Sequence, residues 1–426
     1  MVGERKKDQD ELFIVGSLKE LIPDDYVLKR VDAAVDFSWI RAEVASLYDA
    51  ESGRPSIDPE AAFRLMIAGF LLGIVQDRRL LSEARVNLAI RWFCGFSLDE
   101  ALPDHSSLTR IRERWGEKTF ERCFRRIVLA CQEKGLVAAE TIHVDSTLIR
   151  ANVSWESIVE RHLKEVLKVN ASATRVVERR HKESITDPEA SLATTSRERR
   201  LEPSYKGHLA VDDRAGVIVD IRLTTGVANE GDEIMDQLSR IEHLLGASPA
   251  RVTADAGYAY GKVYAALERR GVEAIIPPKR IWAGKNVMPL LQFKYNARAD
   301  QVRCPQGRVL HRTSRCAHGW FYKSASADCA LCPRRGRCLS PKVNRRTVVI
   351  SETYPELLRA RRRRDHWSKD ALRLYRRHRW RVEGVHAEGK CLHGLRRAVR
   401  RGLANMSIQG YLTAAAINAK RLAASG

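Results

Sequence analysis

The sequence predicts an α/β protein with a mixed sheet and helices on both faces. An all-helical N-terminal domain precedes the sheet, and a Cys-rich insertion interrupts it. Three observations favour this class. Residues 18–136 carry apolar side chains at helical spacing. Residues 141–277 show strand patterns in series and then strands that alternate with helices. Five of the nine cysteines fall between Cys304 and Cys338. With 44% hydrophobic residues, the 426-residue chain can bury a core, which excludes a globally disordered protein.

The N-terminal domain, residues 1–138, contains two clear helix starts. Asp58-Pro59-Glu60 supplies a capping Asp, a Pro for the first turn and an acid near the positive end of the helix. A second helix is expected to begin at residues 104–107. One face of this helix is apolar, and the other carries the basic side chains Arg110, Arg112 and Arg114. A basic amphipathic helix after a short turn is compatible with helix-turn-helix-like DNA binding, although an ordinary solvated helix face has the same pattern.

The sheet follows in residues 139–278. Strands are expected at residues 141–149, 207–211, 217–224, 251–254 and 272–277, and helices at 230–245 and 258–270. Between the first two strands, residues 151–203 are rich in charge, Ser, Thr and Ala, which predicts an insertion that is partly helical and partly flexible. Residues 279–350 form a second, irregular insertion that carries the cysteine cluster. Residues 351–426 are helical again and very basic.

The net charge indicates the class of partner. Lys and Arg total 74 against 53 Asp and Glu, a formal net charge of +21, and a globular protein this basic usually binds nucleic acid. The longest apolar run, residues 65–75, is far shorter than the ~20 residues that a membrane span needs. The N-terminus also lacks the apolar core of a secretory signal. We therefore expect a cytoplasmic protein without a membrane partner, whose cysteines form no disulfide framework.

Three acids stand where a carboxylate needs an explanation. Asp145 lies inside an apolar strand, Asp255 ends another, and Glu383 lies in a helix rich in Arg. Site residues of α/β sheets gather at the carboxyl ends of strands. Carboxylates brought together repel each other unless a strong cation joins them, and Mg²⁺ prefers such hard oxygen ligands. The three acids therefore predict a two-metal site for phosphodiester chemistry, although any one of them alone could be a turn or surface carboxylate.

The helix around Glu383 adds to this prediction. Arg379, Glu383 and Lys390 are spaced by four and seven residues, which puts them on one helix face within roughly 40° of one another. Arg379 and Lys390 are then candidates for binding DNA phosphates, and Trp380 is placed to stack on a base. A solvated face of ion pairs is the alternative. This alternative does not explain the other arginines nearby as well, because their like charges would repel each other without a polyanion.

These motifs in this order resemble those of bacterial insertion-sequence transposases of the DDE type. The resemblance covers nearly the whole chain, including residues 102–108, 144–147, 205–208 and 254–258. It implies an RNase H-like catalytic core, with Asp145 as the Mg²⁺ ligand that bridges two ions. The family's Tyr, Arg, Glu, Lys signature fits Arg379, Glu383 and Lys390. Its tyrosine slot holds Arg376, however, and Tyr375 stands one residue early.

The resemblance implies a transposase that cuts at the ends of a mobile element and joins them to target DNA. The N-terminal helices would bind the terminal inverted repeats, and we expect a homodimer on double-stranded DNA, associated with the nucleoid. Glu388 competes with Glu383 as the third acid but lacks the Arg and Lys spacing. Two other functions stay open: a nuclease of the same fold without strand transfer, and a catalytically inactive or domesticated DNA-binding relative.

The cysteine cluster predicts a second metal. Cys-x2-Cys with further cysteines nearby is typical of structural, tetrahedral Zn²⁺ sites, which have four protein ligands and no open position. We expect a zinc-ribbon-like insertion whose ligands are Cys304, Cys329, Cys332 and Cys338. Cys316, His311 and His318 are further candidates, and ordinary thiols are the alternative.

Overall fold

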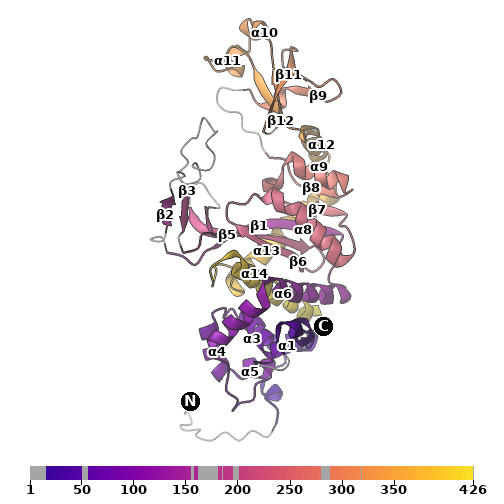
Figure 1. Ribbon diagram of the computed structural model, residues 1–426. Coiled ribbons are helices and arrows are strands. Elements are labelled where there is room, and N and C mark those ends of the chain that lie inside the picture. The colour runs from indigo at the N-terminus through magenta and orange to yellow at the C-terminus, as the bar shows by residue number, and fades with distance from the viewer. Residues whose placement is uncertain are drawn as a thin grey trace, which may run out of the picture. The chain divides into compact units, whose positions relative to one another are not determined.

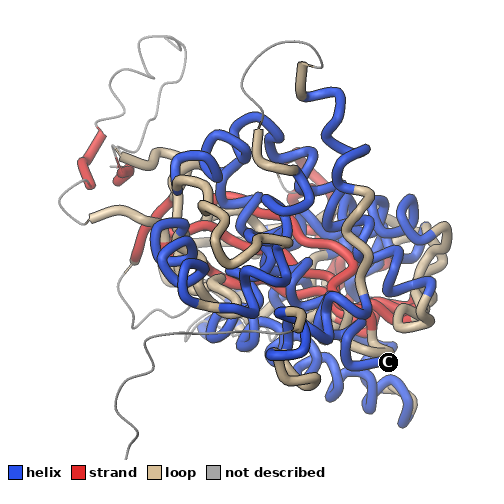
Figure 2. The backbone as a smooth tube through the Cα atoms, turned by 90° about the horizontal axis from the view of Figure 1, so that it is seen from below, coloured by secondary structure: helices blue, strands red, loops and turns tan. Residues whose placement is uncertain are grey.

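The computed structural model describes residues 16–49, 56–154, 158–161, 181–184, 186–194, 201–279, 288–317 and 319–425. The chain divides into two compact units, and Figure 1 labels the helices and strands. The first contains residues 1–138, 146–228 and 382–426, and the second contains residues 139–145 and 229–381. Figure 2 shows helix, strand and loop along the backbone and makes the mixed α/β character visible. Among the described helices, none is long and apolar enough to cross a membrane.

The N-terminal part of the first unit is helical, as predicted. Its α-helices are α1 (Val27–Ala34), α2 (Ile40–Val44), α3 (Pro59–Leu71), α4 (Asp77–Val86), α5 (Leu88–Cys94) and α6 (His105–Glu133), with short 3₁₀ turns at Leu18–Leu21 and Ala45–Leu47. Both predicted helix starts are confirmed. The Asp58 side chain accepts a hydrogen bond from the Ala61 N–H at 2.9 Å, and Asp104 accepts one from Ser106 at 2.8 Å. Helix α6 bends at Gly116, whose φ of 68° is one that glycine adopts readily.

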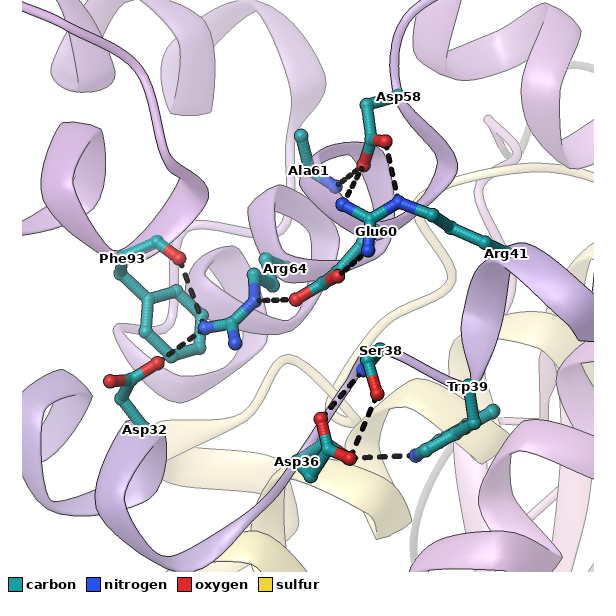
Figure 3. Close-up of polar contacts among 10 residues, drawn as sticks. All are labelled: Asp32, Asp36, Ser38, Trp39, Arg41, Asp58, Glu60, Ala61, Arg64 and Phe93. Carbon is teal, nitrogen blue, oxygen red and sulfur yellow. Dashed lines mark hydrogen bonds and ion pairs between the residues drawn. The ribbon is translucent and has the colours of Figure 1, made fainter.

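One arginine ties several of these helices together (Figure 3). Arg64 of α3 donates to Asp32 of α1 at 2.6 Å and to the Phe93 carbonyl of α5 at 3.2 Å. Its guanidinium carbon lies 5.0 and 5.1 Å from the ring centroids of Phe37 and Phe93. From α2, Arg41 reaches back to the capping Asp58 at 2.8 Å. The N-terminal helices therefore pack as one bundle around charged groups that are hydrogen-bonded.

The last helix, α14 (Leu403–Ser425), forms the core of the first unit. Nearly every residue from Met406 to Ala419 is buried, and the helix contacts α1, α3 and α6. It also packs on strand β6 (Ile218–Thr225), where the Asn418 side chain accepts from the Ile218 N–H at 2.9 Å and donates to the Ile218 carbonyl at 2.8 Å. A helix that is apolar on most sides is expected at such a central place.

Most of the remaining strands of the first unit lie in or at the end of the predicted insertion at 151–203. They are β2 (Ile158–Arg161), β3 (His181–Ser184), β4 (Ser191–Ala193) and β5 (Glu202–Asp212). The described parts of the insertion are thus short antiparallel strands rather than helix, and residues 155–157, 162–180, 185 and 195–200 lie outside the described chain. Strand β5 pairs antiparallel with β6 as the predicted hairpin, and β5 begins earlier than expected.

Strand β1 (Thr141–Arg150) enters both units, and its first half pairs in the second unit. There it is parallel to β7 (Arg251–Thr253), and β7 is parallel to β8 (Glu273–Ile275). The whole hydrogen-bonded order is β2-β3-β4-β5-β1-β7-β8, with β6 also paired to β5. Parallel and antiparallel pairs thus share one sheet, and the predicted α/β class with a mixed sheet is confirmed.

The helices of the second unit are α8 (Glu230–Leu245), α9 (Gly261–Arg269), α12 (Tyr354–Asp365) and the first part of α13 (Lys369–Leu392). Helix α8 has the predicted bounds. Helix α9 begins later than predicted, because the chain first makes a 3₁₀ turn at Ala256–Tyr258 that Asp255 caps. Helix α12 lies within the helical region predicted for residues 351–426 and has Pro355 in its first turn, where proline is well tolerated.

The Cys-bearing insertion is more regular than predicted. It contains a five-stranded antiparallel sheet in the order β13-β12-β11-β10-β9. Its strands are β9 (Lys294–Asn296), β10 (Gln301–Arg303), β11 (Val309–Cys316), β12 (Gly319–Lys323) and β13 (Thr347–Ile350), accompanied by a 3₁₀ turn at Leu290–Gln292 and the short helices α10 (Ser326–Ala330) and α11 (Arg335–Cys338). Val302, Leu310, Tyr322 and Val348 build its own small core. The sequence does not make the alternation of apolar and polar residues along these strands clear, because Arg and Lys are frequent among them.

Candidate active site

Two of the predicted acids lie on neighbouring parallel strands of the second unit, Asp145 within β1 and Asp255 just after β7. The register pairs His143 of β1 with Thr253 of β7. Asp145 and Asp255 each follow two residues later, and side chains two apart along a strand share a face. Their proximity has an electrostatic effect, since the charge of Asp145 raises the pKa of Asp255. The parallel pairing therefore brings Asp145 and Asp255 together as an acid pair.

Asp255 is unfavourably placed for a carboxylate. Although the residue is exposed, loss of surrounding water is the largest cause of its raised pKa, and the Asp145 charge is the second. A hydrogen bond from the Gly257 N–H, at 2.7 Å, opposes the increase. Loss of surrounding water and the charge of Asp145 both disfavour the ionised form of Asp255, and a bound divalent cation would favour that form.

A third carboxylate near the pair was missed by sequence reasoning. Glu230 begins helix α8, and its charge also raises the pKa of Asp255. If Gly257 carried a side chain, its Cβ atom would collide with Oε2 of Glu230. The same Cβ atom would lie 2.7 Å from Oδ1 of Asp255. Gly257 therefore lets both carboxylates approach one point. An acid in the first turn of a helix, five residues after the end of a strand, was the available signal.

Beneath the acid pair lies a buried polar chain from three elements. The Thr253 hydroxyl is 2.6 Å from Nδ1 of His143 and 2.8 Å from Nδ1 of His378, which belongs to α13. His143 and Thr253 are fully buried and His378 is 5% exposed. When both rings are neutral, the hydroxyl donates to one Nδ1 and accepts from the other, so the two histidines must adopt opposite tautomers. This chain links β1, β7 and α13 directly below Asp145 and Asp255.

Tyr375 adjoins the same group, although it stands one residue early for the family signature. Its ring stacks on His378 at 6.4 Å with an interplanar angle of 2°, and it packs against Trp367 at 5.4 Å. Burial raises the pKa of Tyr375, and the charge of Asp255 raises it further. The phenol therefore lies close enough to the acid pair to feel its charge.

The two candidates for the third acid have different surroundings. Both belong to α13 and to the first unit. Glu383 is exposed. Glu388 is half-buried and bonds to Lys420 at 2.7 Å and Arg421 at 2.5 Å, both on α14. Burial alone would raise the pKa of Glu388, but hydrogen bonds from His393 and Lys420 and the charge of Arg421 lower it strongly. Glu388 thus anchors the C-terminal helix, which supports the preference for Glu383.

The basic candidates on α13 are accessible to different degrees. Arg379 is exposed, and Trp380 is among the most exposed large apolar side chains, at 67%. The Arg381 guanidinium lies 4.7 Å from the Trp380 ring centroid. Lys390 is half-buried. Exposure of Arg379 and Trp380 is compatible with contact to a large ligand.

The basic helix face predicted on α6 needs one correction. Arg110 and Arg114 are exposed, and Arg114 lies over the Tyr48 ring at 4.7 Å. Arg112, in contrast, is only 4% exposed and donates to both carboxylate oxygens of Asp77, at 2.6 and 2.8 Å. Arg112 therefore supports the fold from inside the bundle and does not belong to the exposed basic face.

The four cysteines expected as zinc ligands lie around one cavity of about 40 Å³ in the Cys-bearing insertion. They are Cys304, Cys329, Cys332 and Cys338. Burial raises the pKa of Cys338, and the neighbouring thiols Cys329, Cys332 and Cys304 raise it further. Cys316 does not line this cavity and pairs with Gly319 between β11 and β12. Within the described ranges, no group of three or more Cys, His, Asp or Glu side chains already has the geometry of a metal site.

Comparison with known proteins gives two family matches. Residues 16–114 match a transposase domain, DUF772, and residues 303–423 match a transposase DDE domain. Among solved structures, a piggyBac transposase synaptic complex with hairpin DNA is similar over 96% of this chain and 74% of that one, at 10% identity and a TM-score of 0.34.

A Mos1 transposase paired-end complex with the left transposon end is similar over 53% of this chain and 61% of that one, at 14% identity and a TM-score of 0.18. A Mos1 mariner paired end complex with Mn gives 56% and 64%, at 13% identity and a TM-score of 0.18. These structural likenesses are slight. The two domain matches lie in the order that the sequence motifs predict, one on the N-terminal helices and one on the C-terminal catalytic region, and the chain belongs to the DDE transposases.

Proposed function

We propose that Asp145, Asp255 and Glu383 are the catalytic carboxylates with which this transposase cleaves DNA at the ends of a mobile element and joins them to target DNA. The observation that carries the proposal is the acid pair. Parallel pairing of β1 and β7 holds Asp145 beside Asp255 closely enough to raise the pKa of Asp255. Glu383 is the third acid because it is exposed on α13, whereas Glu388 is committed to Lys420 and Arg421.

The donor set fits Mg²⁺. Asp145 and Asp255 offer hard oxygen atoms and repel each other, so a divalent cation would relieve the charge that raises the pKa of Asp255. Following the family resemblance, Asp145 is the ligand that two ions would share. Bound there, Mg²⁺ would supply an activated water or 3′-hydroxyl and would stabilise the leaving oxygen.

The remaining residues of the site bind and orient DNA. Arg379 and Lys390 hold phosphates, and Trp380 offers an exposed ring for stacking on a base. In the N-terminal domain, Arg110 and Arg114 contact the terminal inverted repeats. A homodimer would hold the two ends together, and the protein would work at the nucleoid, where its DNA substrate lies.

A nicking assay with end DNA tests the acids. Asp145→Asn, Asp255→Asn and Glu383→Gln should each abolish Mg²⁺-dependent nicking and leave DNA binding intact, because each amide keeps the shape and loses the charge. Glu388→Gln, one to two turns further along α13, is the matched control and should still nick. Normal nicking by Glu383→Gln together with loss by Glu388→Gln would reverse the assignment of the third acid.

A strand-transfer assay with pre-cleaved ends separates the alternatives. Joining of the ends to target DNA supports a transposase. Nicking without joining supports a nuclease of the same fold. Binding of end DNA without any nicking in Mg²⁺ supports a catalytically inactive relative.

We also propose that Cys304, Cys329, Cys332 and Cys338 bind one structural Zn²⁺. The four cysteines line one cavity, and the other three raise the pKa of Cys338. Coordination of Zn²⁺ would favour the thiolate form of all four. Elemental analysis should find about one zinc per chain. Chelation should loosen the five-stranded sheet around β11 and β12, seen as faster hydrogen exchange, and spare β1 and β7. Metal-free protein in which all these thiols titrate freely would contradict the proposal.

A further inference from the structure

The Cys-bearing insertion carries a disproportionate share of the positive charge. Residues 288–350 contain thirteen Lys and Arg residues against two acids, Asp300 and Asp328. This segment therefore contributes eleven of the chain's 21 net positive charges. A zinc-ribbon-like sheet needs no such excess for its own stability, since like charges repel each other. A charge this concentrated indicates a polyanionic ligand.

The strand register sorts these charges onto the two faces of the sheet. Val302 pairs with Leu310, and Tyr322 pairs with Val348, so these four side chains occupy the core face. Residues one position away along each strand must point to the opposite face, which we call the outer face. The outer face includes two rows of directly paired residues: Lys294, Arg303 and Val309 in one, and Asn296, Gln301, His311, Lys323 and Thr347 in the other; the apolar pair Phe321 and Val349 lies on the same face.

The outer face is basic and accessible. Lys294, Arg303 and His311 are exposed, and Lys323 is half-buried. Neither row contains an acid. Asp300 lies before β10 and accepts from the Tyr322 hydroxyl, and Asp328 lies in α10. The remaining members of the two rows are polar or apolar, so positive charge on this face is not neutralised within the rows.

We propose that the outer face binds the phosphate backbone of duplex DNA. From β9 to β12 there are three strand spacings, or roughly 14 Å, a length over which duplex DNA presents about eight phosphate charges. The choice of DNA as the polyanion rests on the proposed function. Single-stranded DNA fits less well, because its binding sites use successive aromatic platforms. The ring that lies on this face, Phe321, is half-buried, with Lys323 Nζ 5.9 Å from its centroid.

The insertion also offers a matched control. Arg312 and Arg315 face the core side of the same sheet, where they pair with Tyr322 and Trp320. They already form ion pairs with Asp300 at 2.9 Å and Glu352 at 3.0 Å. Lys294→Gln/Arg303→Gln and Arg312→Gln/Arg315→Gln therefore remove equal charge from opposite faces of one sheet.

The test is the salt dependence of binding to a duplex that contains the element end and flanking DNA, measured on the full chain. Each lost phosphate contact lowers the slope of log K against log salt by about 0.9, so the outer-face variant should lose about 1.8. The control variant should keep the wild-type slope. Thermal unfolding of both variants should match wild type, because all four side chains are exposed.

Three results would overturn the inference. Equal loss of slope in both double variants would show only an effect of net charge, and a wild-type slope in the outer-face variant would show no DNA contact. Stronger competition by single-stranded than by duplex DNA would assign the face to a single strand. Failure of the proposed function appears separately, since wild-type protein would then not nick end DNA in Mg²⁺, whatever the outer face binds.

Discussion

Replacing Thr253 with Val should disturb the acid pair from below without touching either carboxylate. Val has nearly the shape of Thr but no hydroxyl, so Nδ1 of His143 and Nδ1 of His378 both lose a partner at 2.6 and 2.8 Å. Each buried polar group left without a partner costs about 1–3 kcal/mol, so the change should cost roughly 2–6 kcal/mol.

Two measurements check this prediction. Urea unfolding should show a lower midpoint for Thr253→Val. The Mg²⁺ concentration that gives half-maximal nicking should rise, because the segments of β1 and β7 that position Asp145 and Asp255 lose a shared hydrogen bond. Thr253→Ser keeps the hydroxyl and should stay close to wild type in the Mg²⁺ titration. If Thr253→Val unfolds and responds to Mg²⁺ as wild type does, the buried chain neither stabilises the fold nor positions the acids.

Three further predictions concern charge. Glu388→Gln should destabilise the protein by about 1.5–3 kcal/mol at neutral pH, since it weakens charged hydrogen bonds to α14, and urea unfolding of this variant beside wild type measures the loss. Asp255→Asn should raise the unfolding temperature at pH 7 without divalent ions. The pKa of Asp255 is higher in the folded protein than its unfolded value near 3.8, so wild type loses stability as pH rises above that value. The difference in unfolding temperature between Asp255→Asn and wild type should therefore vanish below that pH. Arg112→Ala should cost about 3–5 kcal/mol, because it breaks the buried pair with Asp77, while Arg114→Ala should leave the unfolding midpoint unchanged and weaken end binding.

Local signals predicted much of the fold. Helices α3 and α6 begin where Asp58 and Asp104 cap them, and α8 has the bounds that its apolar spacing predicts. Capping and periodicity act within a few residues, so a single segment contains the information. The five-stranded sheet was harder to predict, because its strands are short and two of them, β9 and β10, have only three residues each. Its core is assembled from residues that are distant in sequence.

The same contrast holds in the site. Asp145 and Asp255 were predictable because each ends or interrupts an apolar strand, an arrangement that a single segment reveals. Arg112 was misassigned because it was grouped with Arg110 and Arg114, although residues two apart point to different sides of a helix, and its buried partner Asp77 lies 35 residues earlier. A charge pattern along one helix therefore cannot separate a ligand-binding arginine from one that neutralises a buried acid.

The His143–Thr253–His378 chain shows what sequence patterns leave out. Each residue alone has an ordinary explanation, and His378 stands 125 residues from Thr253. Parallel pairing places His143 against Thr253, and the packing of α13 then brings in His378. His378 precedes Glu383 by five residues on the same helix, α13. The Thr253 hydroxyl thus joins β1, β7 and the first part of α13 within the second unit, and Thr253→Val tests this support while every carboxylate stays in place.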